Sequence, residues 1–266
     1  MSKLNHIKVL YSLTFLIVIC LSSRAQSIVN TEKLFNDNED GFATSAELLG
    51  SAISGNANVL LVEFSMNFRY RWGKSNLKLL SGGEYIQEDL ADVSNNLFTQ
   101  LRYNYHFNDK NRLVSLYQLQ YNKVLLLNSR QLLGLGLRHS FFEKSIDTLK
   151  RIKSDITIGL MQEEEILNTE TLMLGEKNYT NYTRTMLSMV FSIELSKQFT
   201  FINTTYFQQY LKNLSDYRLF NEINLVFAIN KWLSVNCDIE YRFDSEPPSS
   251  LNNSDFNTNL GLQFNL

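Results

Sequence analysis

The sequence predicts an all-β fold: a single transmembrane, antiparallel, up-and-down β-barrel of about twelve strands that follows a cleaved signal peptide. Three observations predict it. The chain begins with a short apolar segment, long stretches alternate apolar and polar side chains, and the last residues continue that alternation to the C-terminus. The composition agrees, because 18 Phe and 13 Tyr stand beside only 2 Pro, a bias that favours strands and aromatic belts at membrane interfaces.

Residues 1–25 have the pattern of a secretory signal peptide. Lys3 and Lys8 precede an apolar run that ends near Leu21, and Ser23-Arg24-Ala25 fits a small-x-small cleavage site. The apolar run is shorter than the roughly twenty residues that a membrane-spanning helix needs. We therefore expect cleavage after residue 25 rather than a membrane anchor.

Residues 26–41 show no strand pattern and are expected to form a polar periplasmic lead-in, so that the barrel occupies residues 42–266. After cleavage only Cys237 remains, and the exported chain has no internal disulfide. The net charge is -2 and no basic tract is present, which excludes a nucleic-acid footprint. No motif calls for a cofactor.

The alternation itself is clearest in two stretches. Between residues 59 and 72 the even positions, from Leu60 to Trp72, are all apolar, whereas the odd positions include charged residues. Between residues 233 and 244 the apolar face is opposed by a face with several full charges. Strands of about ten residues cross a bilayer at a tilt, and a sheet with open edges is not viable in lipid, so the strands must close into a barrel.

The predicted strands are residues 42–52, 59–72, 76–87, 97–107, 113–122, 131–142, 152–162, 182–195, 199–210, 217–229, 233–244 and 255–266. Bacterial barrels join their strands by short periplasmic turns and longer outer loops in alternation. The outer loops are expected at residues 88–96, 163–181, 211–216 and 245–254, with 163–181 the longest. Residues 143–151 are long for a periplasmic turn and do not fit this alternation.

The chain ends with a pattern like the signal that the bacterial barrel-assembly machinery recognises. A polar residue, a glycine two positions later and apolar residues at the third-last and last positions make up this signal; here they are Asn259, Gly261, Phe264 and Leu266. Glycine permits close backbone approach at an end strand, and the apolar residues face lipid. We expect the assembly machinery to be a partner.

The mature chain also resembles the YdiY-like family, domain of unknown function 481. The resemblance is carried by Ser54-Gly55-Asn56, by Gly134 and Gly136 after Arg130, by Asp216-Tyr217-Arg218, and by the stretch from Tyr241 to Pro248 followed by Asp255. The stretch Tyr241-Arg242-Phe243-Asp244-Ser245-Glu246-Pro247-Pro248 is the most specific part. The resemblance implies an outer-membrane barrel and implies no activity.

Charged side chains of both signs are expected on the face that points into the barrel. The candidate lumen charges are Glu63, Arg69, Arg102, Arg138, Arg184, Glu222, Asp238, Glu240 and Arg242. They are consistent with a charged pore or ligand cavity. They are also consistent with a structural network that fills the barrel, because charges with little access to water are tolerated when they are paired.

Two further features invite functional readings. His139-Ser140 could belong to a lipid hydrolase, but neighbours in a strand point to opposite faces and cannot form a nucleophile–base pair. The acidic run from Glu163 to Glu165 could bind divalent cations at the outer surface, but we interpret it as part of a solvated outer loop. Catalytic and metal-binding residues are therefore assigned to none of these positions.

We expect a non-enzymatic protein of the bacterial outer membrane, in contact with outer-membrane lipid and lipopolysaccharide. Its role is predicted to be that of a narrow passive channel or of a structural, stress-related component of the envelope. The alternatives are a surface-binding barrel that uses its long outer loops and, from a different class, a barrel-wall lipid hydrolase.

Overall fold

A computed structural model describes residues 40–53, 59–88, 91–147, 150–169, 172–249 and 251–265. The predicted signal peptide at 1–25, residues 26–39 of the predicted lead-in and Leu266 lie outside the described residues. Within the part that is described, no helix is long and apolar enough to cross a membrane.

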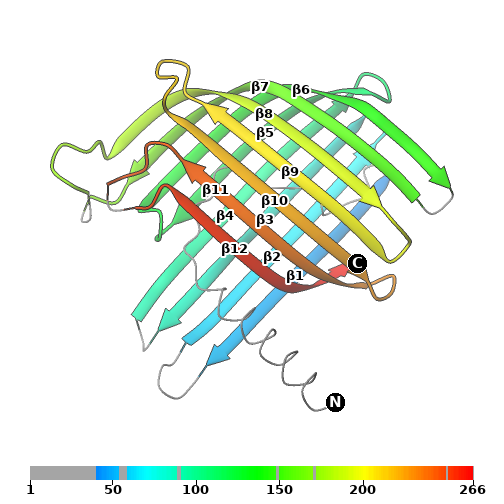
Figure 1. Cartoon of the computed structure of the whole chain (residues 1–266), viewed down its shortest axis with the longest axis horizontal. Coiled ribbons are helices and arrows are strands. Elements are labelled where there is room, and N and C mark those ends of the chain that lie inside the picture. Colours follow the sequence, from blue (N-terminus) through cyan, green and yellow to red (C-terminus); the bar gives the residue numbers. More distant parts are fainter. Residues whose placement is uncertain are drawn as a thin grey trace, which may run out of the picture.

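Twelve antiparallel strands form one closed sheet in which every strand pairs with its neighbours in sequence, and β1 pairs with β12 (Figure 1). The strands are β1 (Gly41–Ile53), β2 (Val59–Trp72), β3 (Ser75–Glu88), β4 (Ala91–His106), β5 (Asn111–Asn122), β6 (Leu127–Asp147), β7 (Lys150–Leu167), β8 (Tyr179–Glu194), β9 (Phe199–Gln209), β10 (Tyr217–Ala228), β11 (Leu233–Asp244) and β12 (Ser254–Asn265). The predicted fold class and strand number are confirmed.

Two predicted connections are wrong in length, both because strands continue further than the pattern indicated. Residues 143–151 are mostly strand, since β6 extends to Asp147 and β7 starts at Lys150. The expected loop at 88–96 is also largely strand, because β4 begins at Ala91. The long connections that remain, 168–178, 210–216 and 245–253, lie at one end of the barrel together with the β5–β6 turn at 123–126 (Figure 1). The short turns at 73–74, 107–110, 195–198 and 229–232 lie at the other end.

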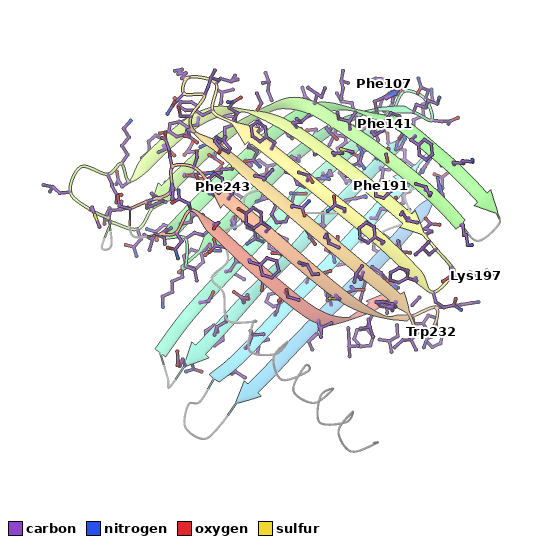
Figure 2. All side chains as sticks on the ribbon, viewed as in Figure 1. Phe107, Phe141, Phe191, Lys197, Trp232 and Phe243 are labelled. Atoms are coloured by element: carbon purple, nitrogen blue, oxygen red, sulfur yellow. The ribbon has the colours of Figure 1, made fainter. Side chains whose placement is uncertain are left out.

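The outer wall is apolar, as an up-and-down barrel in lipid requires. Leu133, Leu135 and Leu137 on β6 are each more than half exposed, and the residues between them, Gly134 and Gly136, are buried. Figure 2 shows that the side chains of Phe141 and Phe191 belong to this wall, while Trp232 marks the short-turn end. The polar residues of the alternating pattern therefore face the interior.

Glycine allows β6 and β7 to approach closely. A Cβ atom on Gly159 would lie only 2.2 Å from the backbone oxygen of Leu135, and a Cβ on Gly136 would lie 2.8 Å from Cε of Met186. These glycines leave room for larger side chains from neighbouring strands to turn inward.

Candidate functional site

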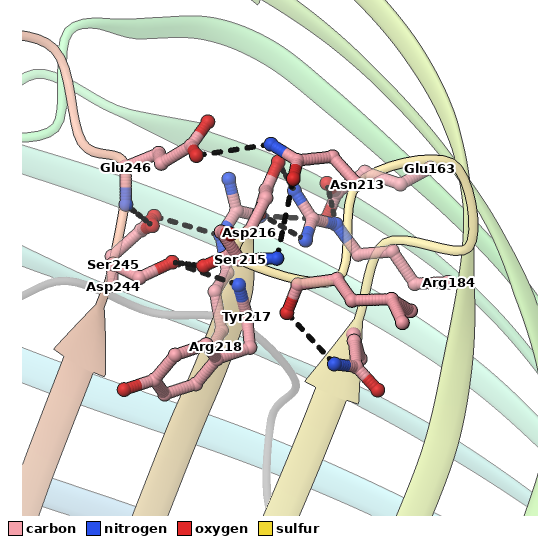
Figure 3. Close-up of polar contacts among 12 residues, drawn as sticks. Glu163, Arg184, Asn213, Ser215, Asp216, Tyr217, Arg218, Asp244, Ser245 and Glu246 are labelled. Atoms are coloured by element: carbon pink, nitrogen blue, oxygen red, sulfur yellow. Dashed lines mark hydrogen bonds and ion pairs between the residues drawn. The ribbon is translucent and has the colours of Figure 1, made fainter.

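The interior at the long-loop end holds a dense set of ion pairs. We call it the outer cluster, and it consists of Arg130 on β6, Glu163 and Glu165 on β7, Arg184 on β8, Asp216 just before β10, Arg218 on β10 and Asp244 at the end of β11. Strand alternation turns each of the strand residues inward. Figure 3 shows most of them meeting below the loops.

Arg218 is the centre of the outer cluster. Its Nη1 donates to Glu163 Oε2 at 2.8 Å and to Glu165 Oε1 at 3.0 Å, and its Nε donates to Asp244 Oδ2 at 2.7 Å. The contacts with Glu163 and Glu165 reach past β8 and β9, because Arg218 lies on β10 and both carboxylates lie on β7. This side chain therefore links β7, β10 and β11 to one another on one side of the lumen.

Arg184 ties the cluster to a loop. Its Nε donates to Glu163 Oε1 at 2.8 Å, and its Nη1 donates to Asp216 Oδ1 at 2.6 Å (Figure 3). Only 1% of the Arg184 side chain is exposed, and that of Glu163 is fully buried. The guanidinium also lies 5.4 Å from the ring centre of Tyr182, which stacks on Tyr210. Such a desolvated charge is tolerated because both carboxylates and the rings surround it.

The loops above the outer cluster are joined to one another. Ser249 donates from its backbone N and its hydroxyl to Glu176 Oε1, at 2.7 and 2.6 Å, which connects the β7–β8 and β11–β12 loops. These hydrogen bonds, chiefly that from the Ser249 hydroxyl, lower the pKa of Glu176. Asn213 donates to Glu246 at 3.0 Å and so joins the β9–β10 loop to the same assembly (Figure 3).

A cavity of about 290 Å³ lies between these loops and the outer cluster. Its floor is charged, and leucine and proline side chains from the strand ends and loops make up much of the remaining lining. The residues that carried the family resemblance, from Asp216 to Arg218 and from Arg242 to Pro248, contribute strongly to it. Two stretches that are separated in the sequence thus form one structural feature.

An apolar layer lies below the outer cluster on the same side of the lumen. It contains one buried residue from each of β5 to β10, namely Leu116, Leu132, Met161, Met186, Tyr206 and Phe220. Arg242 connects it to the charged layer, since its guanidinium lies 5.1 Å from the ring centre of Phe220. The interior of this side is therefore layered rather than uniformly polar.

A second charged cluster lies toward the short-turn end and is centred on Asp155 of β7. Its Oδ2 accepts from Arg138 Nη2 at 2.6 Å and from Arg112 Nη2 at 3.0 Å, while Lys153 Nζ lies 3.7 Å away. Ser140 donates to the other oxygen at 2.5 Å. Three cations share this carboxylate, so this inner cluster carries an excess of positive charge, whereas the outer cluster is nearly balanced.

All nine candidate lumen charges point into the barrel. Arg69, Arg102, Arg138, Arg184, Glu222, Asp238 and Arg242 are buried, and Glu63 and Glu240 are partly buried on the same face. They do not form one site. Arg184 belongs to the outer cluster and Arg138 to the inner cluster, while Arg69 and Arg102 lie on β2 and β4, in register with Lys78 of β3 between them.

The candidate charges on β10 and β11 form a separate acidic patch. Asn224 donates to both Glu222 and Asp238, at 2.5 and 2.8 Å, and holds these two carboxylates together. Glu240 accepts from Arg242 at 2.6 Å. This patch lies six strands away from β4 and β5 around the closed sheet, on the opposite wall from the strands that carry Arg102 and Arg112.

The residues of the C-terminal pattern divide between the two faces of β12. Gly261 lies on the inner face, where an added Cβ would meet Glu47, and Asn259 lies beside the same small space. Phe264 points outward and is 43% exposed. Leu266 falls outside the described residues.

His139 and Ser140 lie on opposite faces of β6. The His139 ring lies on the outer side, with its Nδ1 2.8 Å from Asn111 Oδ1, while Ser140 is buried against Asp155. The two side chains do not form a nucleophile–base pair in this structure. Among the described residues, no group of three or more His, Cys, Asp or Glu is placed to hold a metal ion.

The interpretation of residues 163–165 as a solvated outer loop is wrong. Strand β7 continues to Leu167 and turns Glu163 and Glu165 inward, where arginines neutralise them. Arg112, Arg130 and Asp216 were also missed. The sequence did indicate that Glu163 and Glu165 face inward, because both lie an even number of residues after Asp155 on the same strand. Asp216 lies in a loop, where no such periodicity indicates which way its side chain points.

A closed twelve-stranded barrel with an apolar wall and a charged interior defines the protein as a porin-like β-barrel. The chain belongs to the family described as "Protein of unknown function, DUF481", whose model matches residues 46–266. This confirms the resemblance found in the sequence. No curated protein has a sequence that matches this chain.

The chain is also similar to solved structures. A NanC porin structure aligns with a TM-score of 0.50 at 11% identity, covering 85% of this chain and 99% of that one. A KdgM porin aligns with a TM-score of 0.44 at 11% identity, covering 84% and 98%, respectively. The translocator domain of the autotransporter NalP from Neisseria meningitidis gives 0.45 at 10% identity, covering 86% and 90%. At such identities the likeness concerns the fold alone.

Proposed function

We propose that this protein is a non-enzymatic barrel of the bacterial outer membrane that forms a narrow passive channel for small polar solutes. The observation that carries the proposal is the charged inner face of a closed barrel whose outer face is apolar. Such a lining provides hydrogen-bonding partners for a solute that has lost part of its hydration. The long-loop end faces the cell exterior in this proposal, as in other bacterial barrels.

Narrowness follows from two features of the lumen. Arg218 reaches from β10 to carboxylates on β7, and the apolar layer fills the same side directly below. The basic residues of β4 and β5 and the acidic patch of β10 and β11 line opposite walls of the interior. A permeating ion would pass charged groups of both signs.

The test is single-channel conductance of the refolded mature protein in a planar bilayer. Charge reversal by Arg102→Glu or Glu240→Arg should shift the reversal potential in a salt gradient, because each changes the charge of the lumen wall. Lys197→Glu is the matched control, because Lys197 lies in an exposed turn outside the lumen (Figure 2). Equal shifts in all three variants would contradict the lumen assignment.

A structural role in the envelope is the second candidate. It is favoured by the depth of burial inside the barrel, where Gln100, Gln118 and Asn224 have no exposed surface. A refolded barrel that resists protease and migrates in heat-modifiable form, yet never conducts, would support this role and exclude the channel.

A further inference from the structure

The cavity at the long-loop end has the size and position of a small-molecule site. Its volume of about 290 Å³ lies at the lower end of the range typical of ligand pockets, so it suits a guest much smaller than a polymer. The outer cluster closes it below, and the Glu176–Ser249 and Asn213–Glu246 contacts hold loops together around it. A pore that merely passed water would not need this enclosure.

The charged lining is close to neutral overall. Cationic groups are contributed by Arg130, Lys177, Arg184, Arg218 and Arg242, and anionic groups by Glu165, Glu176, Asp216, Asp244, Glu246 and Asp255. A guest with charge of one sign would draw one member away from its ion pair and leave the other uncompensated, which is costly in a buried site. A zwitterion supplies a carboxylate for an arginine and an ammonium for a carboxylate, so every charge keeps a partner.

The remaining lining selects for an apolar side chain on that guest. Leu125, Leu127, Leu167, Leu172, Pro247, Pro248 and Leu251 provide apolar surface around the charged floor. Thr180 also lines the cavity, and its buried hydroxyl oxygen has no hydrogen-bond partner among the residues that the structure describes. Buried polar groups normally have a partner, and a guest in the cavity would provide one.

We propose that this cavity is a binding site for a small zwitterion with an apolar side chain, namely a free amino acid or a dipeptide. The carboxylate of the guest lies among the arginines of the outer cluster, its ammonium lies near Asp216 or Asp244, and its side chain lies against the leucines and prolines. The site goes beyond the proposed channel, and binding to it is measured without any conductance.

Isothermal titration calorimetry on the refolded full-length mature barrel tests the proposal with four probes: leucine, leucyl-leucine, N-acetylleucine and leucinamide. The last two carry only one charge each. We expect leucine or leucyl-leucine to bind at least about tenfold more tightly than both single-charge analogues, since each analogue leaves a buried charge unpaired. The better of the two zwitterions identifies the guest as an amino acid or a dipeptide. Equal binding of all four probes, or of none, would overturn the proposal.

A conservative variant locates the guest. Thr180→Val removes the hydroxyl that lacks a partner and should weaken zwitterion binding about fivefold, the value of one hydrogen bond. Thr157→Val is the matched control, because Thr157 is buried inside the same barrel but does not line the cavity. Unchanged affinity in Thr180→Val, or equal losses in the two variants, would overturn the assignment to this cavity.

Discussion

Replacement of Arg218 by Met tests the outer cluster most directly. The change removes a guanidinium that contacts Glu163, Glu165 and Asp244 at 2.7 to 3.0 Å and keeps a side chain of similar reach. Removing one partner of a buried ion pair costs about 3–5 kcal/mol, because the other charge stays buried without compensation.

The loss of unfolding free energy in Arg218→Met should fall near the lower end of that range. Glu163 still accepts from Arg184, and Glu165 still accepts from Arg130, so neither loses every partner. Asp244 loses its arginine, but its side chain is 21% exposed and water can reach it. We therefore expect Arg218→Met to lower the free energy of unfolding by about 3 kcal/mol.

Urea titration of the refolded barrel, followed by the fluorescence of its tryptophans, measures this loss. Arg151→Met is the matched control, because the Arg151–Glu143 pair joins the same residue types at a site where 28% and 41% of the side chains are exposed. Exposed pairs contribute only about 0.2–1 kcal/mol. Arg218→Lys, which retains the charge, should lie between the two. If Arg218→Met and Arg151→Met lower the free energy of unfolding equally, the ion pairs of Arg218 do not stabilise the barrel.

Changes at other positions have separate expected outcomes. Gly159→Ala should cost about 1–3 kcal/mol in the same titration, because its Cβ would meet a backbone oxygen, whereas Gly261→Ala should cost less because its Cβ meets a flexible side chain. Asp155→Asn should cost about 3–5 kcal/mol, since three cations lose a shared carboxylate; a loss below 1 kcal/mol would contradict the inner cluster. The pKa of Glu176 is lowered from the ordinary carboxyl value of 4.5, so its contact with Ser249 stabilises the loops fully at pH values above 4.5. That stabilisation is lost as the pH falls through the lowered pKa of Glu176. Protease cleavage within residues 168–178 should therefore increase under acid conditions, and Ser249→Ala should show the increased cleavage already at neutral pH.

The alternation of apolar and polar residues was sufficient to predict the strands and which face of the sheet most charged side chains occupy. Asp238, Glu240 and Arg242 share a face because residues two apart in a strand always do, whatever the rest of the chain does. The same rule separates His139 from Ser140. Apart from the β1–β12 pair that closes the barrel, each strand pairs with its neighbours in sequence, so the order of the strands in the sheet follows their order in the chain.

The clusters could not be predicted in this way, because their contacts are distant in the sequence. Arg218 and Glu163 are 55 residues apart, and three consecutive glutamates have low strand propensity, so the run was assigned to a loop. Its strand conformation depends on arginines that neutralise it from β6, β8 and β10. Asp216 approaches Arg184 only through the fold of the β9–β10 loop, which no periodicity describes.

Two of the stretches that carry the family resemblance lie at the outer cluster. An up-and-down barrel needs only alternation along its strands, and many side chains satisfy that requirement. The stretches Asp216-Tyr217-Arg218 and Arg242 to Glu246 meet stricter conditions: Arg218 must reach Asp244, the Tyr217 backbone N must reach the Ser245 hydroxyl at 2.8 Å, and the Ser245 hydroxyl must reach the Ser215 carbonyl at 2.8 Å. These contacts shape the floor and wall of the cavity rather than the membrane-facing surface. Two of the stretches that carry the resemblance are thus the ones that build the loop-end site.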